Sequence, residues 1–262
     1  MPLSVYLLPS STQADLTVIV DVLRFTTSVA YALANGARSI VPCQTVEAAR
    51  SASRQLPTAI LAGERHAVKP DGFDCGNSPL EFSRRAVQGK DIIWTTTNGT
   101  RAIALAMTLE VSISPRSIST QPPSPAPATP HPIPTRDLLL ASYVNHTAVV
   151  SLLEPRLREG ASVAVVCSGR EGGFALEDSA CAGRLVRRLH AAVGDALMMN
   201  DGARASACID EAYGEDFPRL FRDAQHGRFL RDRGFGSDLE ACAALDALHV
   251  VPRERDGRFV AG

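Results

Sequence analysis

The strongest constraint on this fold is the alternation of short apolar segments with longer amphipathic ones. Strands are expected at 16–20, 39–41, 59–62, 91–94, 138–141 and 161–166. The first, fourth and sixth of these are apolar rather than alternating, which is typical of strands covered on both faces. Helical patterns occupy 26–35, 46–55 and 178–192. This order predicts an α/β fold, a three-layer α/β/α sandwich with a mainly parallel sheet.

The rest of the chain departs from this alternation. From about residue 201 to 248 the pattern is mostly helical, and 249–260 is expected to form a terminal hairpin that turns at Asp256-Gly257. Residues 111–136 are dense in Pro, Ser and Thr and predict a disordered surface insertion. A tolerated loop is preferred there over a lid or a polyproline II segment that binds a partner. We expect one domain spanning 1–262, with two lobes at about 1–110 and 137–262 as an alternative.

Charge and composition exclude several classes of protein. There are 27 Lys and Arg residues against 28 Asp and Glu residues, so no overall field favours binding to nucleic acid or to an anionic membrane. The first residues lack the pattern of a signal peptide, and no apolar stretch is long enough to span a bilayer, so a cytoplasmic protein is expected. Six cysteines without a C-x-x-C pair indicate reduced thiols.

Unusual polar residues follow the expected strands. Parallel strands leave a sheet at one edge, so the loops after them are expected to converge there and to bind a ligand. The TTTNGTR stretch at 95–101 suits an oxyanion through free N–H groups, hydroxyls and an arginine. Simple helix capping by Thr97 or Asn98 explains the same residues equally well. The CSGREGG stretch at 167–173 is a second candidate anion cradle, with a flexible turn as the alternative.

Charged residues at these strand ends indicate a cation site. Asp21 follows a buried strand, where a carboxylate needs a partner such as Arg24 or a metal ion. Glu64, Glu177 and Asp178 add oxygen ligands of the kind that Mg²⁺ prefers, although ordinary helix N-terminal charge also explains the last two. Cys167 is interpreted as a buried cysteine rather than a nucleophile. The histidines His66 and His146 are interpreted as structural or exposed.

Several motifs in order along the chain carry a resemblance to a known family. They are VIVDVLRFTTSVAYALANGA, GER followed by GFDCGNSP, TTTNGTRA, ASYVN, VCSGREGGFALEDSACAG and HGRFLRDRGFGSDLEACAALDALHVVP. Together they resemble the 2-phosphosulfolactate phosphatase family over nearly the whole chain except the Pro/Ser-rich insertion. The resemblance implies a Mg²⁺-dependent hydrolase that releases phosphate from 2-phospho-3-sulfolactate to give 3-sulfolactate.

The resemblance also implies site residues by motif position. The expected catalytic residues are Asp21, Arg24 and Arg101, and the expected metal ligands are Asp21, Glu64, Glu177 and Asp178. Expected substrate-binding residues are Thr26, Thr27, Asn77, Ser78, Thr96, Asn98, Gly99, Asn145 and Gly169. Phe25 and the His66-Ala67 pair depart from the family pattern and put the fit of the substrate in question.

Two chemical routes remain open from the residues. In the first, Mg²⁺ positions an attacking water while Arg24 and Arg101 stabilise the phosphoryl oxygens; in the second, Asp21 attacks phosphorus directly. The expected partner is a small anionic phospho-substrate, and a homo-oligomer is an open possibility. Alternative functions are a phosphatase for another small phospho-carboxylate and a non-catalytic domain that binds a phospho-ligand.

Overall fold

The computed structural model describes residues 1–107 and 137–262, so the insertion expected at 111–136 lies outside the described residues. In this part of the chain the strands form one ten-stranded sheet in the order β4-β5-β3-β10-β9-β6-β2-β7-β1-β8. The strands are β1 Pro2–Tyr6, β2 Leu16–Val20, β3 Ser39–Pro42, β4 Ile60–Gly63, β5 Asp91–Thr95, β6 Asp137–Ala141, β7 Val163–Cys167, β8 Met198–Met199, β9 Pro252–Arg255 and β10 Arg258–Ala261.

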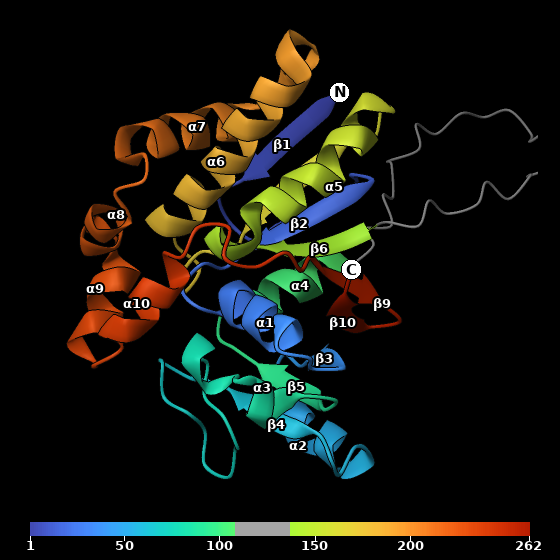
Figure 1. The fold of residues 1–262 in the computed structure, drawn as a ribbon, viewed down its shortest axis with the longest axis vertical. Helices are drawn as coiled ribbons and strands as arrows, with labels where there is room; N and C mark the ends of the chain where they lie inside the picture. The colour runs from blue at the N-terminus through green and yellow to red at the C-terminus, as the bar shows by residue number, and fades with distance from the viewer. Residues whose placement is uncertain (108–136) are drawn as a thin grey trace, which may run out of the picture.

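Helices cover both faces of this sheet (Figure 1). They are α1 Phe25–Ala34, α2 Val46–Gln55, α3 Arg84–Val87, α4 Gly99–Met107, α5 His146–Arg158, α6 Leu176–Val193, α7 Asp201–Tyr213, α8 Phe217–Asp223, α9 Gln225–Asp232 and α10 Gly236–Cys242, with 3-10 turns η1 Pro79–Glu81, η2 Tyr143–Asn145 and η3 Gly194–Ala196. The expected α/β fold with a mainly parallel sheet, a helical C-terminal part and a terminal hairpin is confirmed.

The sheet consists of two parallel sets of strands that run in opposite directions. Strands β3, β4 and β5 pair in parallel, and so do β1, β2, β6, β7 and β8. The C-terminal hairpin β9-β10 joins the sets through three antiparallel pairings, which reverse the strand direction between them. The expectation that all strands leave at one edge is therefore wrong. It failed because the linking hairpin comes from the end of the chain and gives no local signal of direction.

Twist brings the carboxyl ends of the two sets toward each other. Five steps separate β2 from β5 along the sheet. At roughly 20–25° a step, the strand direction turns by on the order of 100° over that distance. The sheet thus wraps around α1 and α4, which follow β2 and β5. The buried cluster around these helices accordingly includes Ile19 from β2 and Trp94 from β5.

Side chains along β2 point alternately to the two faces of the sheet, which explains how both faces are packed. Ile19 packs toward α1 and α4, whereas Val18 and Val20 pack with α5 and α6 on the other face. A third cluster, around Ile93 and Phe73, lies between β5 and α2. The buried strands read as continuous apolar runs because each face has its own helices.

Most element boundaries expected from the sequence agree with the structure to within two residues. Strand β2 and helix α2 match the expected ranges, and Thr45 caps α2 by accepting a hydrogen bond from the Ala48 N–H. Strands β1 and β8 were missed. The single-domain organisation and its two-lobed alternative stay predictions, and β1 and β2 pair with β6 and β7 across the proposed boundary between the lobes.

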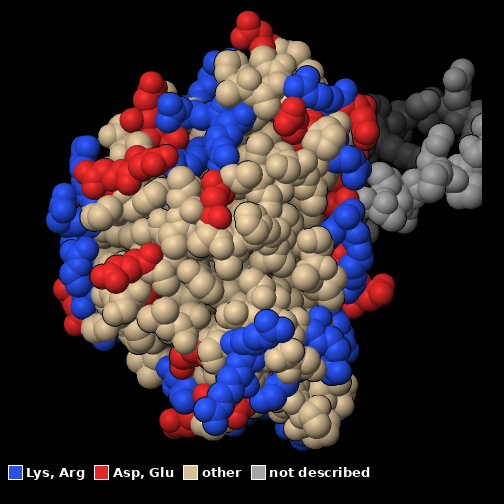
Figure 2. All heavy atoms as spheres, in the orientation of Figure 1, with Lys and Arg blue, Asp and Glu red and all other residues tan. Residues whose placement is uncertain are grey.

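Acidic and basic side chains are interspersed over the face shown in Figure 2. The near balance of charge in the sequence therefore extends to this surface. In the described part of the chain, no helix combines the length and the apolar character that crossing a membrane requires. Whether the protein binds nucleic acid, a membrane or a second copy of itself stays at the level of prediction.

Candidate active site

Loops from both sets of strands meet at one pocket, which we call the strand-end pocket. The space between its walls is about 430 Å³ when the open solvent at its mouth is counted, and the enclosed part is much smaller. Its walls come from the loops after β2, β4, β5 and β7, from the segment before η1, and from α9. The lining residues are Asp21, Leu23, Arg24, Glu64, His66, Ala67, Asn77, Thr96, Thr97, Asn98, Arg170, Glu171, His226 and Phe229.

Asp21 is the buried carboxylate of this pocket. It is 6% exposed, and its Oδ1 accepts a hydrogen bond from the Phe25 N–H at the start of α1, at 3.3 Å. Burial raises its pKa to about 6, with the charges of Glu64 and Glu177 acting in the same direction and His226 opposing them. A carboxylate in this position is costly without a positive partner, and that is a physical reason to expect a cation or a positively charged side chain beside it.

Glu64 connects two of the loops that form the pocket. Its Oε1 accepts a hydrogen bond from the Thr97 N–H at 2.8 Å, and its Oε2 accepts one from the Ala67 N–H, also at 2.8 Å. The carboxylate thereby fixes the loop after β4 against the loop after β5. Each oxygen keeps lone-pair capacity for a further ligand.

Two buried oxygens in the pocket wall have no partner. They are Asn77 Oδ1 and Thr97 Oγ1, and neither accepts or donates a hydrogen bond within the described residues. Buried polar atoms in folded proteins are nearly always satisfied, so each exception calls for an explanation such as a bound ion or substrate. Both atoms belong to residues that line the strand-end pocket.

The start of α4 lies directly against Asp21. A Cβ atom on Gly99 would stand 2.8 Å from Asp21 Oδ2 and 2.4 Å from Phe25 Cδ1, so the backbone approaches this closely only because residue 99 is glycine. Asn98 contributes its carbonyl to α4 and accepts a hydrogen bond from the Glu171 N–H through Oδ1, at 3.0 Å. Of the TTTNGTR stretch, Thr96, Thr97 and Asn98 line the pocket.

Arg24 is held by the C-terminal helices. Its Nη1 donates to Asp238 Oδ2 at 2.5 Å, and its guanidinium lies 4.3 Å from the centre of the Phe235 ring. Asp238 also accepts a hydrogen bond from Ser78 Oγ at 2.7 Å. The charge of Arg24 is therefore already neutralised by a buried carboxylate, although the residue lines the pocket.

His226 is a pocket residue that the sequence reasoning missed. It comes from α9, its side chain is 16% exposed, and its Nδ1 lies 3.5 Å from Glu177 Oε1. Glu177 itself is buried behind the histidine and does not line the pocket. The available signal is the HGRFLRD segment, which carries part of the family resemblance and begins with this histidine.

The CSGREGG stretch is a tight turn rather than a cradle of free donors. The N–H groups of Gly169 and Glu171 donate to Asp178 Oδ2 and Asn98 Oδ1, and Arg170 and Gly173 exchange two backbone hydrogen bonds. The interpretation as an anion cradle is thus wrong for most of these N–H groups, because protein acceptors already occupy them. What the turn presents to the pocket is the side chain of Arg170, which the sequence reasoning had not assigned to the site.

Several expected site residues have structural partners. Asp178 Oδ1 also accepts from the Val22 N–H, and burial together with Glu177 and Asp21 raises the pKa of Asp178 well above its usual value. The hydroxyls of Thr26 and Thr27 donate to backbone carbonyls. The Asn145 amide accepts a hydrogen bond from the Ser142 N–H and donates to the Leu140 and Val250 carbonyls. None of these side chains lines the strand-end pocket, so their site roles stay predictions.

Arg101 and Cys167 also do not line the strand-end pocket. Arg101 is exposed on the first turn of α4, and its expected catalytic role stays a prediction. Cys167 is fully buried at the end of β7, and burial raises the pKa of its thiol well above the usual value. The thiol is therefore protonated at neutral pH, as expected for a structural cysteine rather than a nucleophile.

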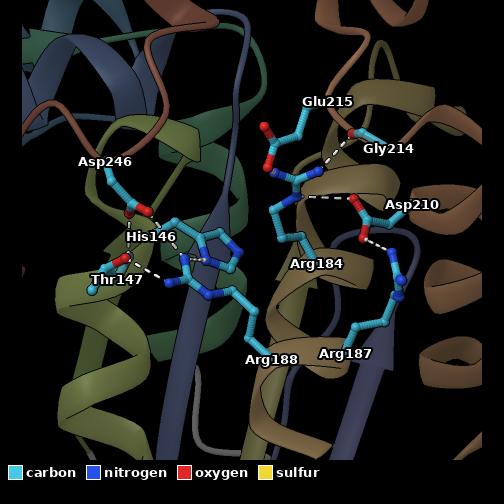
Figure 3. A network of polar contacts seen from close by, with 9 residues as sticks. All are labelled: His146, Thr147, Arg184, Arg187, Arg188, Asp210, Gly214, Glu215 and Asp246. Atoms are coloured by element: carbon cyan, nitrogen blue, oxygen red, sulfur yellow. Dashed lines mark hydrogen bonds and ion pairs between the residues drawn. The ribbon is translucent and has the colours of Figure 1, made fainter. Parts of the chain in front are cut away.

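A second cavity, beside α6, has a different chemistry. Arg184, Arg187 and Arg188 project from one face of α6 and meet Asp210, Glu215 and Asp246, as Figure 3 shows. Arg184 is bound by Asp210, Glu215 and the Gly214 carbonyl, and Arg188 donates to Asp246 and Thr147. Three positive and three negative groups offset each other there. The network ties α5, α6 and α7 together rather than leaving charge available for a ligand.

Known proteins resemble the chain over most of its length. The model of the family described as 2-phosphosulpholactate phosphatase matches residues 3–114 and 133–257. The chain belongs to this family. A "Probable 2-phosphosulfolactate phosphatase" from Pseudothermotoga lettingae is 35% identical over 249 residues, which cover 95% of this chain and 93% of that protein. Proteins of the same description from a Synechococcus strain and from Clostridium perfringens are 36% and 30% identical, over 94% and 97% of this chain and 91% and 92% of their own lengths.

The strand-end pocket of this phosphatase-family chain contains oxygen atoms of the type that a hard cation such as Mg²⁺ would bind. They are the carboxylate oxygens of Asp21 and Glu64 and the unpartnered carbonyl oxygen of Asn77. Within residues 1–107 and 137–262, no three His, Cys, Asp or Glu side chains are grouped closely enough to hold a metal ion by themselves. A cation here would therefore complete its shell with water and substrate oxygens, as Mg²⁺ commonly does at phosphate sites.

Proposed function

We propose that this chain hydrolyses 2-phospho-3-sulfolactate to 3-sulfolactate and phosphate in the strand-end pocket with the help of Mg²⁺. The observation that carries the proposal is the meeting of the buried Asp21 carboxylate, the unpartnered Asn77 oxygen and the guanidinium of Arg170 in one pocket. Family membership and the description of the relatives favour this substrate. A compound with a phosphate, a carboxylate and a sulfonate needs both cationic and donor groups around it.

Asp21, Glu64 and Asn77 would hold the cation. When bound, Mg²⁺ would neutralise phosphoryl charge, which is the main requirement of phosphoryl transfer. At the start of α4 the Thr97 and Thr100 N–H groups already donate to Glu64 Oε1 and Thr96 Oγ1, so other N–H groups of this helix start would have to meet the phosphoryl oxygens. Because Gly99 brings this helix start against Asp21, the carboxylate and the N–H groups can act on one phosphate.

Hydrolysis also requires a proton to reach the leaving oxygen. A water oxygen bonds to phosphorus, the bond from phosphorus to the substrate's C2 oxygen breaks, and that oxygen takes up a proton. His226 is suited to donate it because Glu177 holds its Nδ1 and leaves Nε2 as the remaining ring nitrogen for the pocket. Phosphoryl transfer to Asp21 followed by hydrolysis is the alternative route, and it would use the same histidine.

The test is multiple-turnover release of phosphate from 2-phospho-3-sulfolactate. We expect turnover that stops with EDTA and returns with Mg²⁺, and Asp21→Asn should abolish it while the far-ultraviolet circular dichroism spectrum stays unchanged. Stoichiometric binding without turnover would instead support a non-catalytic domain that binds a phospho-ligand. Faster turnover of 2-phospholactate than of 2-phospho-3-sulfolactate would favour a phosphatase for another small phospho-carboxylate.

A further inference from the structure

Two guanidinium groups line the strand-end pocket, and they differ in how they are bound. Arg24 is buried and paired with Asp238, as described above. The Arg170 side chain is 13% exposed, and its guanidinium makes no hydrogen bond within the described part of the chain. Its one ion pair is with Glu171, at 3.8 Å, and the Glu171 side chain is 55% exposed. The long distance and the exposure of Glu171 to water make this pair weak.

Arg170 is nevertheless held in place. Its Cζ lies 4.5 Å from the centre of the Phe229 ring, and the backbone of its turn is closed by the two hydrogen bonds between Arg170 and Gly173. Asn98 anchors the next residue by accepting from the Glu171 N–H. A guanidinium on an aromatic ring keeps its N–H edge free for a planar or pyramidal oxyanion. The guanidinium is therefore held in place while its N–H groups stay available to a ligand.

The order of burial places Arg170 between the floor and the mouth of the pocket. Asp21, Glu64 and Asn77 are less than 9% exposed, whereas the His66 and Glu171 side chains at the rim are 74% and 55% exposed. A phosphoryl group at the buried carboxylates would leave the rest of the substrate pointing toward Arg170. On the proposed substrate that remainder carries the sulfonate and the carboxylate.

We propose that Arg170 binds the oxyanion of the substrate that is not the phosphoryl group, the sulfonate or the carboxylate, and so sets specificity. Phe229 is the positioning residue that holds Arg170. This inference rests on the proposed function, and it names the part of the substrate that Arg170 recognises in the strand-end pocket. Arg24 is less suited to this role because the charge of its guanidinium is already offset by the buried Asp238 carboxylate.

The experiment compares Arg170→Met with Arg233→Met. Arg233 lies over the same Phe229 ring, at 3.8 Å, but does not line the pocket, so it is a matched control for loss of an arginine from that ring. We expect Arg170→Met to raise KM for 2-phospho-3-sulfolactate by about ten- to hundredfold, the worth of a charge-assisted hydrogen bond, with kcat changed less than about threefold. Arg233→Met should leave both constants near those of the unsubstituted protein. An unchanged KM in Arg170→Met, or an equal rise in Arg233→Met, overturns the inference.

Two further measurements identify the group that Arg170 contacts. Binding of inorganic phosphate, measured by calorimetry with Mg²⁺ present, should be the same in Arg170→Met as in the unsubstituted protein; an equal loss would mean that Arg170 contacts the phosphoryl group and would overturn the inference. 2-Phospholactate lacks the sulfonate. If its KM is unaffected by Arg170→Met, the sulfonate is the group bound; if its KM rises as much, the carboxylate is.

Variants of Phe229 and binding of the product, 3-sulfolactate, give the remaining controls. Phe229→Leu should raise KM in the same direction by a smaller factor, about three- to tenfold, and Phe229→Tyr, which keeps a ring, should restore it. If the protein hydrolyses neither substrate, the proposed function fails. The inference is then decided by calorimetric binding of 3-sulfolactate, which must be tight in the unsubstituted protein and weakened in Arg170→Met; equal or absent binding in both overturns it.

Discussion

Replacing Gly99 with alanine tests the contact on which the pocket depends. Gly99 is the first residue of α4, and its backbone conformation is one that alanine can adopt. The added Cβ would lie 2.4 Å from Phe25 Cδ1 and 2.8 Å from Asp21 Oδ2, and both neighbours would have to move. Phe25 has little room for this, because its ring is fully buried and packs edge-on to Trp94 at 5.8 Å.

The expected effect on stability is moderate. Overpacking a core costs about 1–3 kcal/mol, and the gain from replacing glycine by alanine offsets roughly 0.4–1 kcal/mol of it. The free energy of unfolding should therefore fall by about 1–2 kcal/mol. In a chain of this size that lowers Tm by about 2–8 °C.

The expected effect on activity is larger. Displacement of Asp21 by about 1 Å should lower kcat by on the order of a hundredfold, because the reacting groups no longer meet in the required geometry. Thermal unfolding and initial rates of phosphate release are the two measurements. Gly236→Ala is the control, since Gly236 also begins a helix, α10, and its added Cβ would meet no atom within 4 Å. A Gly99→Ala protein that is as stable and as active as Gly236→Ala would refute the reasoning.

Two other perturbations test the fold and the chemistry separately. Asp137 at the start of β6 pairs with Arg253 and Arg255 of β9, and although burial opposes it, these arginines hold the pKa of Asp137 below its usual value. A carboxylate with a lowered pKa stabilises the fold above about pH 4 and loses that contribution as pH falls through its folded-state pKa. Asp137→Asn should therefore be less stable than the unsubstituted protein at pH 7, and the difference should shrink as pH falls below about 4; a difference between urea midpoints that stays constant with pH would contradict this. His226→Asn should lower kcat for phosphate release by about a hundred- to ten-thousandfold with little change in inorganic phosphate binding; an unchanged kcat would rule out His226 as the proton donor.

The sequence was sufficient for most of the helices and strands and for two carboxylates of the pocket. Apolar runs of four to six residues between helical patterns indicate buried strands, and Asp21 and Glu64 are conspicuous because charged residues seldom follow such strands directly. Both line the strand-end pocket, together with Arg24, Asn77 and Asn98. Asp21, Arg24 and Glu64 were expected from their place after buried strands, whereas Asn77 was expected only from the family resemblance.

The direction of the strands and the hydrogen-bond partners of the side chains were not predictable in the same way. The threonines at 26 and 27 look like phosphate ligands in sequence, yet their hydroxyls donate to carbonyls of Asp21, Ala141 and Val22, because a tight turn after β2 leaves those acceptors open. The short strand β8 has two residues and no period to detect. Whether a hydroxyl or a glycine N–H is free for a ligand depends on which acceptor lies nearby in space, and spacing along the chain does not encode that.

The C-terminal helices explain why the site could not be assembled from the strand-end motifs alone. Helices α8, α9 and α10 lie together along one side of the molecule (Figure 1), and they supply His226 to Glu177 and Asp238 to Arg24. Buried without these partners, Glu177 and Arg24 would each carry an uncompensated charge, which costs several kcal/mol per ion. The helices therefore take the place of water as the partner of charges at the strand ends, and in doing so they bring His226 and Phe229 into the pocket wall. A truncation that removed them would leave those charges unpaired and the pocket without His226, so stability and activity should be lost together.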